Sequence, residues 1–353
     1  MSPQSPHFVS SPPPEGAQAS LLEVRDLSVQ LQTHRGPAHA VRDVSFTLER
    51  GETLGLVGES GCGKSITALA LLGLLPENAR VSGSILFDGQ QLVGQPERSM
   101  CKLRGERIAM IFQEPMTALN PVHTVGRQVA EPLRLHRGLS AAEARKRAIA
   151  LLDRVGIADA ARRIDAYPHQ FSGGQRQRIT IAMALACGPD LLIADEPTTA
   201  LDVTIQRQIL ELIRELVAER GMALMLISHD LGVIAHNVRR MLVMYGGSVV
   251  ESGPTASVFA HRSHPYTLGL FSARPGLHSA RGRRLTTIPG TVPELVDLPQ
   301  GCPFAGRCRW TIPDCHAVVP PPVMVEPGHA ARCIRLEAVA AEAPGSLPLW
   351  GRA

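Results

Sequence analysis

Short apolar runs alternate with amphipathic stretches along most of this chain. Runs of strand length lie at residues 21–32, 41–48, 52–58, 83–92, 107–113, 190–196, 222–230 and 241–253. Two of these runs, 83–92 and 241–253, contain turn residues near their middle and predict β-hairpins. The pattern therefore predicts a series of strands along the chain.

Helical patterns separate these strands. Residues 64–75 predict a helix that is ended by Pro76, and residues 203–221 carry apolar positions at i, i+3 and i+4 before Gly221. From about residue 114 to residue 189 the pattern is helical throughout. Strands that alternate with helices in this way predict an α/β fold with a mostly parallel sheet and a helical insertion.

Composition divides the 353 residues into three parts. Residues 1–20 are rich in Pro, Ser and Gly and lack the basic start and apolar core of a secretory signal, which predicts a disordered leader. Residues 21–272 carry the α/β pattern. Residues 273–353 begin with a basic linker of small residues and continue as a Pro- and Cys-rich extension. We expect the leader, a main domain and a small C-terminal extension.

Charge and hydropathy exclude some functions. The formal net charge is only +4 over a long chain, which argues against nucleic acid as a partner. The longest apolar runs have strand length, well short of the roughly 20 residues that a bilayer-spanning helix needs. We expect a protein of the reducing cytoplasm, where structural disulfides are rare.

The stretch GESGCGKS follows a predicted strand and precedes a predicted helix, which is the context of a phosphate-binding P-loop. Glycines let the backbone N–H groups turn inward, and the helix N-terminus adds positive potential for phosphate oxygens. Lys64, one of only three lysines in the chain, would contact the β- and γ-phosphates, and Ser65 would bind Mg²⁺. The predicted nucleotide-binding residues are Gly58, Glu59, Ser60, Gly61, Cys62, Gly63, Lys64, Ser65 and Ile66.

Two acids close the apolar run LLIADE. Asp195 stands where a carboxylate would hold Mg²⁺, and Glu196 follows it, placed to accept a proton from an attacking water. Cys62 inside the P-loop is interpreted as a small filler; the alternative is a reactive thiol activated by Lys64 and the helix N-terminus.

FSGGQRQR, residues 171–178, resembles the LSGGQ signature of ABC-transporter ATPases. Further pieces fall in the order of that family: Gln113 resembles the Q-loop, Asp202 the D-loop and His229 the switch histidine. The resemblance covers about residues 21–275. It implies a P-loop NTPase-type ABC ATPase core with a helical signature insertion.

The resemblance also implies how the motifs act. Signature residues of one chain contact the ATP held by the P-loop of another, in a head-to-tail dimer with two ATPs; these residues are Ser172, Gly173, Gly174 and Gln175. Catalysis would fall to Glu196, His229 and Gln113, and Mg²⁺ to Ser65, Gln113 and Asp195. One feature departs from the family: the first strand carries no aromatic residue to stack on adenine. Leu31 and His34 are the two candidates in its place.

Four cysteines gather in the C-terminal extension, at positions 302, 308, 315 and 333. Their spacing lacks the tight C-x₂₋₄-C pair usual for zinc, so spacing alone leaves the metal open between zinc, iron–sulfur and none. The tail and the segments HPYTLGLF and IPGTVPEL resemble the C-terminal extension of oligopeptide/dipeptide-importer ATPases, a group that also serves nickel. That resemblance implies a [4Fe–4S] cluster held by Cys302, Cys308, Cys315 and Cys333.

The expected function is that of the ATP-hydrolysing subunit of a di- or oligopeptide importer, with ATP and Mg²⁺ as its ligands. Expected partners are a second ABC ATPase subunit, identical or related, two membrane permeases, and an extracytoplasmic solute-binding protein that acts through them. The chain would be peripheral, at the cytoplasmic face of the membrane. Alternatives are import of nickel, glutathione or another small solute, export, and a soluble ABC ATPase that acts on DNA or ribosomes.

Overall fold

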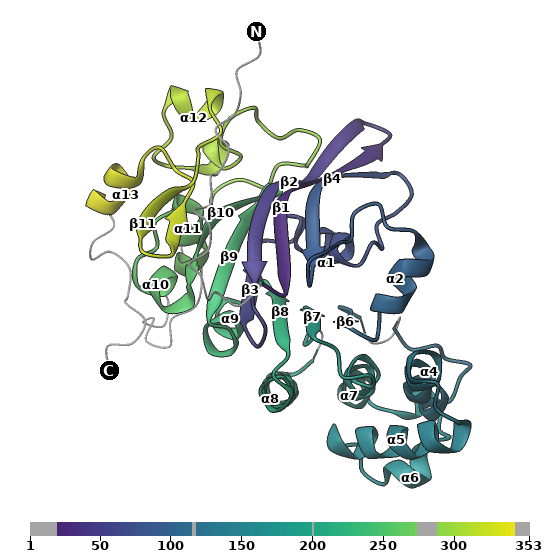
Figure 1. Cartoon of the computed structure of the whole chain (residues 1–353). Helices are drawn as coiled ribbons and strands as arrows, with labels where there is room; N and C mark the ends of the chain where they lie inside the picture. Colours follow the sequence, from purple (N-terminus) through teal and green to yellow (C-terminus); the bar gives the residue numbers. More distant parts are fainter. Residues whose placement is uncertain (1–19, 115–117, 200, 274–287, 343–353) are drawn as a thin grey trace, which may run out of the picture.

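The computed structural model describes residues 20–114, 118–199, 201–273 and 288–342 (Figure 1). The predicted leader, apart from residue 20, and most of the predicted basic linker lie outside these ranges. Two sheets and the helices around them make up the described part. No helix in these ranges is long and apolar enough to cross a membrane.

The smaller sheet is antiparallel, with strand order β2-β1-β4-β5. Its strands are β1 (Leu22–Thr33), β2 (Gly36–Leu48), β4 (Ala79–Phe87) and β5 (Gln90–Gln91). The β1–β2 hairpin turns tightly, since Thr33 pairs with Gly36 at its tip. This turn lies close to the predicted phosphate-binding loop.

The larger sheet has eight strands in the order β11-β12-β10-β9-β3-β8-β7-β6. The five strands from β9 to β6 are parallel, and β10, β12 and β11 add antiparallel strands at one edge. The bounds are β3 (Thr53–Val57), β6 (Ile108–Ile111), β7 (Leu191–Asp195), β8 (Ala223–Ser228), β9 (Arg240–Tyr245), β10 (Ser248–Pro254), β11 (Val323–Glu326) and β12 (His329–Ala331). The predicted parallel α/β sheet is confirmed, and the C-terminal extension supplies two of its strands.

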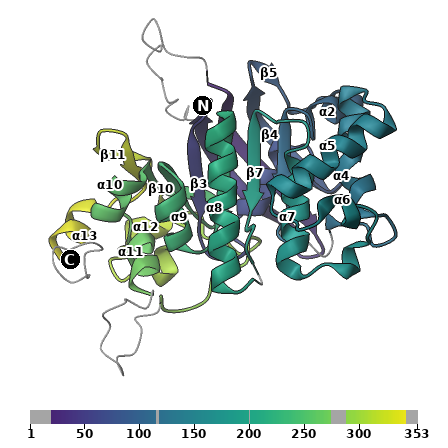
Figure 2. The same cartoon turned by 90° about the horizontal axis from the view of Figure 1, so that it is seen from below.

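Helices pack on both faces of the larger sheet, and others lie beside it or in the C-terminal extension. They are α1 (Lys64–Leu71), α2 (Glu97–Leu103), α4 (Val125–Arg137), α5 (Ala141–Arg154), α6 (Ala160–Arg163), α7 (Gly173–Ala184), α8 (Val203–Arg220), α9 (Leu231–Asn237), α10 (Thr255–Ala260), α11 (Pro265–Ser272), α12 (Pro313–Ala317) and α13 (Leu336–Glu342). Two single 3₁₀ turns are also present, at Pro168–Gln170 and Ala305–Arg307. Figure 2 shows α8 across the middle of the sheet, with α4–α7 on one side and the extension on the other.

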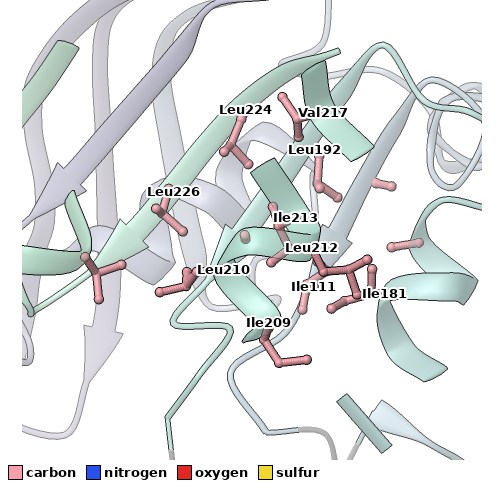
Figure 3. Close-up of a cluster of buried hydrophobic side chains, with 14 of the residues drawn as sticks. Ile111, Ile181, Leu192, Ile209, Leu210, Leu212, Ile213, Val217, Leu224 and Leu226 are labelled. Carbon is pink, nitrogen blue, oxygen red and sulfur yellow. The ribbon is translucent and has the colours of Figure 1, made fainter. Parts of the chain in front are cut away.

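Apolar side chains explain why α8 lies there. Its buried face packs against β7 and β8 on the sheet and against α7, as Ile209, Leu212 and Ile213 show (Figure 3). A second core lies on the opposite face, where α1 packs between the two sheets. Each Å² of apolar surface that is buried contributes about 25 cal/mol to the free energy of folding. The two cores are therefore the main source of stability. They hold the carboxyl ends of β3, β7 and β8 in fixed positions.

One local prediction needs correction, and three elements were not predicted. The first helix ends at Leu71, four residues before the predicted end at Leu75, because Gly73 adopts a left-handed conformation (φ 61°) that terminates helices. Helix α2 and the short strands β11 and β12 were not predicted. Strands this short have too few residues for a period to show, and their pairing with β10 is a tertiary contact.

Candidate functional site

The P-loop connects β3 to α1, as the sequence predicts. Gly63 has φ 105° and a Cβ there would lie 2.4 Å from the Ala40 carbonyl oxygen, so only glycine fits. Lys64 is buried, and its Nζ donates to the carbonyl oxygens of Gly58 (2.8 Å) and Glu59 (3.0 Å). The ammonium group therefore lies over the loop, where a phosphate oxygen would replace a carbonyl as its partner.

Cys62 is fully buried beside this ammonium group, with Sγ 3.9 Å from Nζ of Lys64. Burial raises the pKa of its thiol, and the attraction of Lys64 does not offset that effect. A protonated, inaccessible thiol is a poor nucleophile. The structure supports the interpretation of Cys62 as a filler.

Asp195 and Ser65 are two of the three predicted magnesium ligands, with Gln113 as the third. Asp195 ends β7 and is buried, and the Ser65 hydroxyl is near enough to its carboxylate to act against the effect of burial on its pKa. Burial raises the pKa of Asp195, and its Oδ1 atom has no hydrogen-bond partner. A buried carboxylate oxygen without a partner is costly, and a hard cation is the ligand that would satisfy it. The two side chains thus fit Mg²⁺.

Glu196 is the centre of a second cluster. Its two carboxylate oxygens contact Gln113 Nε2 (3.1 Å), His229 Nδ1 (3.0 Å) and Thr199 Oγ1 (2.9 Å). The structure thus brings together all three predicted catalytic residues, which come from three different strand ends. Thr199 was not predicted; its position three residues after Glu196 on a turn is the only signal that the sequence offers.

The environment of Glu196 keeps it ionised. Burial alone raises its pKa, but the hydrogen bonds from His229 and Thr199 outweigh this effect and the pKa is lowered. Its backbone has φ 45°, a left-handed conformation that is unusual for a non-glycine residue. A carboxylate held in this way, beside the magnesium site, can accept a proton from water.

The signature residues start helix α7. Ser172 is the N-cap and forms a capping box with Gln175, in which each side chain accepts from the other's backbone N–H at 3.1–3.3 Å. Gly174 packs under α8, where an added Cβ would lie 2.8 Å from Ile205, while an added Cβ at the exposed Gly173 would meet only Leu201, at an ordinary contact distance of 3.8 Å. Asp202 caps α8 through the N–H of Ile205 (3.0 Å). In the described residues no hydrogen bond joins Ser172–Gln175 to the P-loop.

Arg307 of the C-terminal extension and Tyr266 of α11 hold the P-loop from outside. Arg307 is nearly buried and forms two hydrogen bonds to the carboxylate of Glu59 (2.8 and 3.2 Å), and the Glu59 backbone N–H donates to Tyr266 Oη (2.8 Å). These contacts join residues that are more than 200 positions apart. They lie beyond what a local sequence pattern can predict.

The four cysteines of the extension line one small cavity of about 10 Å³. Burial, reinforced by the neighbouring thiols, raises the pKa of both Cys302 and Cys308 to about 11. Among the described residues, no group of three or more His, Cys, Asp or Glu side chains has the arrangement needed to hold a metal ion. The structure therefore gives no support to the predicted [4Fe–4S] cluster. It does place the four thiols around one point.

Three features meet at the carboxyl ends of β3, β7 and β8: the phosphate-binding loop, the pair Asp195 and Ser65, and the cluster around Glu196. This arrangement defines a P-loop nucleoside-triphosphatase.

Comparisons with known proteins specify the family. Residues 41–199 match the ABC transporter model, and residues 250–315 match the model described as the C-terminal region of oligopeptide/dipeptide transporters. A peptide import ATP-binding protein of Brucella suis is 55% identical over 317 residues, 89% of this chain and 95% of that protein. Another, from Brucella melitensis, is 50% identical over 91% of this chain and 98% of that protein.

Solved structures agree. The dimeric ATP-binding cassette MJ0796, in a post-hydrolysis state bound to ADP and Pi, superposes with TM-score 0.60 and 28% identity, over 66% of this chain and 98% of that chain. The cbiO1 protein of Clostridium perfringens, part of the ABC transporter complex cbiONQ, gives TM-score 0.59 and 30% identity, over 69% and 92%. The chain belongs to the oligopeptide/dipeptide-transporter family of ABC ATPases. It is an ATP-hydrolysing subunit.

Proposed function

We propose that this chain hydrolyses ATP to energise the uptake of di- and oligopeptides through partner permeases. The observation that carries the catalytic part is the convergence of Gln113, Thr199 and His229 on Glu196, beside the buried Asp195–Ser65 pair. The peptide part is supported by relatives at 50–55% identity that are named as peptide import ATP-binding proteins.

The residues divide the hydrolytic work. The P-loop, Gly58 to Ile66, holds the phosphates with Lys64. Ser65, Asp195 and Gln113 would hold Mg²⁺, which would supply positive charge to stabilise the phosphates. Glu196 takes a proton from water as the water oxygen bonds to the γ-phosphorus and the bond to the bridging oxygen breaks. His229 is placed to orient Glu196 and to contact the released phosphate.

A single chain leaves its signature unused. Ser172, Gly173, Gly174 and Gln175 have no hydrogen bond to the P-loop of their own chain in the described residues, and Gly173 is exposed. We propose that these four residues contact the ATP bound to a second ABC ATPase subunit. The residue of that subunit that corresponds to Asp202, its D-loop residue, would lie nearby. The pair would bind two permeases at the cytoplasmic face of the membrane, with residues 114–189 nearest to them.

We propose the same division of the chain as the sequence indicates: a leader at 1–20, an ATPase domain at 21–272 and an extension at 273–353. The pairing of β12 with β10 supports a tightly joined extension rather than an independent domain. Proteolysis that separates the extension from the ATPase domain should leave both fragments associated.

The cellular test of the function is peptide uptake. In cells that lack this chain, the wild-type chain should restore uptake of a radiolabelled tripeptide, and Lys64→Ala should not. Lys102→Ala is the matched control, because this lysine lies at the exposed end of α2. Restored uptake of nickel or glutathione, but not of the peptide, would contradict the peptide assignment and leave the ATPase assignment intact.

A [4Fe–4S] cluster on Cys302, Cys308, Cys315 and Cys333 is a separate proposal. It is argued from chemistry: the four thiols, together with His264 and without a carboxylate, line one cavity, and thiolates are the usual ligands of iron–sulfur clusters. When bound, such a group would crosslink the extension. Anaerobic purification should give brown protein with about four irons and four sulfides per chain, and Cys315→Ser should lose both. Colourless, iron-free protein would refute the proposal.

A further inference from the structure

A pocket of about 400 Å³ opens beside the P-loop. Three separate segments line it: the β1–β2 turn, the P-loop and the extension segment 292–296. Its lining residues are Thr33, His34, Arg35, Ala38, Ser60, Gly61, Val292, Pro293, Glu294, Leu295 and Val296. A volume of this size is within the range of small-molecule sites.

The pocket is continuous with the phosphate site. Ser60 and Gly61 belong both to its wall and to the P-loop, three to four residues before Lys64. A nucleotide whose phosphates lie on this loop must place its ribose and base within one nucleoside length of it. The pocket occupies that position and has mainly aliphatic side chains on the extension side.

The extension segment is fixed to the turn by ion pairs. The guanidinium of Arg35 pairs with both Glu294 and Asp297, the latter at 2.7 Å. All three side chains are substantially exposed, so these pairs add little to stability but set the position of the segment. Val292 packs on the main hydrophobic core, which anchors the same segment from below. In Figure 1 a yellow-green loop of the extension runs toward the purple strands β1 and β2.

This arrangement bears on the missing aromatic residue of the first strand. Leu31 packs against the core between the sheets and is not part of the pocket wall, whereas His34 is. We propose that the adenine base of ATP binds in this pocket, between His34 and the aliphatic residues Val292, Leu295 and Val296 of the extension. The proposal rests on the phosphate site proposed above. It makes the extension part of the nucleotide site of its own chain.

Leu295 gives the sharpest test, because it is half-buried in the pocket wall and lies outside both hydrophobic cores. Calorimetric titration of the full chain with ATP should show about tenfold weaker binding for Leu295→Ser, as expected for a lost apolar contact. Inorganic tripolyphosphate, which has no base, should bind the wild type and Leu295→Ser equally. The matched control is Val319→Ser, an exposed valine in the same extension, which should leave ATP binding unchanged.

Binding of ATP and of tripolyphosphate together distinguishes the proposed base pocket from the proposed phosphate site. Lys64→Ala should lose both ATP and tripolyphosphate, and retained tripolyphosphate binding there would refute the phosphate site itself. If Leu295→Ser binds ATP as the wild type does, the base pocket is wrong and the phosphate site stands. If it weakens tripolyphosphate as much as ATP, Leu295 acts on the P-loop rather than on the base, and the proposal is equally wrong.

Photolabelling gives a readout that does not depend on a variant. After irradiation with 2-azido-ATP, peptide mapping should find the adduct on residues 33–38 or 291–297, and excess ATP should suppress it. An adduct confined to other residues would overturn the proposal.

Discussion

Glu59 shows how one side chain of the P-loop depends on a distant segment. Its carboxylate is held by Arg307, whose side chain is only 7% exposed, and its backbone N–H by Tyr266. A buried, bidentate ion pair constrains geometry far more than a surface pair does. The extension therefore sets the shape of the loop that receives phosphate.

Replacement of Arg307 by Met should consequently raise the KM for ATP by about three- to tenfold, with kcat much less affected, because the P-loop loses order before ATP binds rather than during the reaction. Steady-state ATPase kinetics measure this. Arg309→Met is the control, since Arg309 is exposed and stacks on Trp310. A fall in kcat at constant KM would contradict a positioning role for Arg307.

His264 makes stability depend on pH. It is buried at the N-cap of α11, where its Nδ1 accepts from the backbone N–H of Tyr266 (3.1 Å), and burial lowers its pKa from 6.5 to about 4. Between pH 6.5 and pH 4 the unfolded chain binds a proton there that the folded chain does not. Stability must therefore fall as the pH falls through this window.

Between pH 7 and pH 5 this residue should lower the free energy of unfolding by about 2 kcal/mol. Urea unfolding at the two pH values measures it. His264→Asn keeps a capping side chain without a titratable ring, so its stability should fall by correspondingly less. An equal pH dependence in both proteins would show that His264 does not carry the effect.

At the scale of elements, α7 presents two adjacent glycines with different surroundings. Gly174 is covered by Ile205 of α8, whereas Gly173 is exposed and an added Cβ there would meet only Leu201, at an ordinary contact distance of 3.8 Å. The first glycine position therefore has room for a side chain within its own chain, which fits a surface reserved for another subunit's nucleotide. Because the two glycines differ in this way, replacing each of them by alanine tests the proposed dimer.

Gly173→Ala should leave the melting temperature unchanged or slightly higher, because alanine favours the helix, yet lower the ATPase rate at least about tenfold. Gly174→Ala should lower the melting temperature, since its Cβ would lie 2.8 Å from Ile205 Cγ2. Calorimetry and ATPase assays on both variants make the comparison. Normal ATPase activity in Gly173→Ala would contradict the role of the signature at a second subunit's ATP.

At the scale of the whole molecule, the sequence predicted the framework well. Apolar runs at 52–58, 190–196 and 222–230 became β3, β7 and β8, because a strand buried on both faces must be apolar throughout. The positions of Lys64 at the start of α1 and of Glu196 directly after β7 followed from their motifs. A helix-ending glycine at position 73 was a readable signal that was missed.

The features that could not be predicted from the sequence depend on contacts between distant segments. Arg307 reaches Glu59 across 248 residues, and β12 joins β10 across more than 70, and no local period encodes either contact. The same is true of the pocket between the β1–β2 turn and residues 292–296. The extension looked like an appendage in the sequence, but in the structure it is an edge of the main sheet and a wall beside the P-loop.

The account depends most on Glu196 as the base at an ATP site. The direct measurement is ATP binding and turnover by the chain assembled with its partner subunits, for the wild type and Glu196→Gln. We predict that Glu196→Gln binds ATP as tightly as the wild type but turns over at least about a hundredfold more slowly, the effect expected of a lost general base. Turnover at the wild-type rate would contradict the central claim.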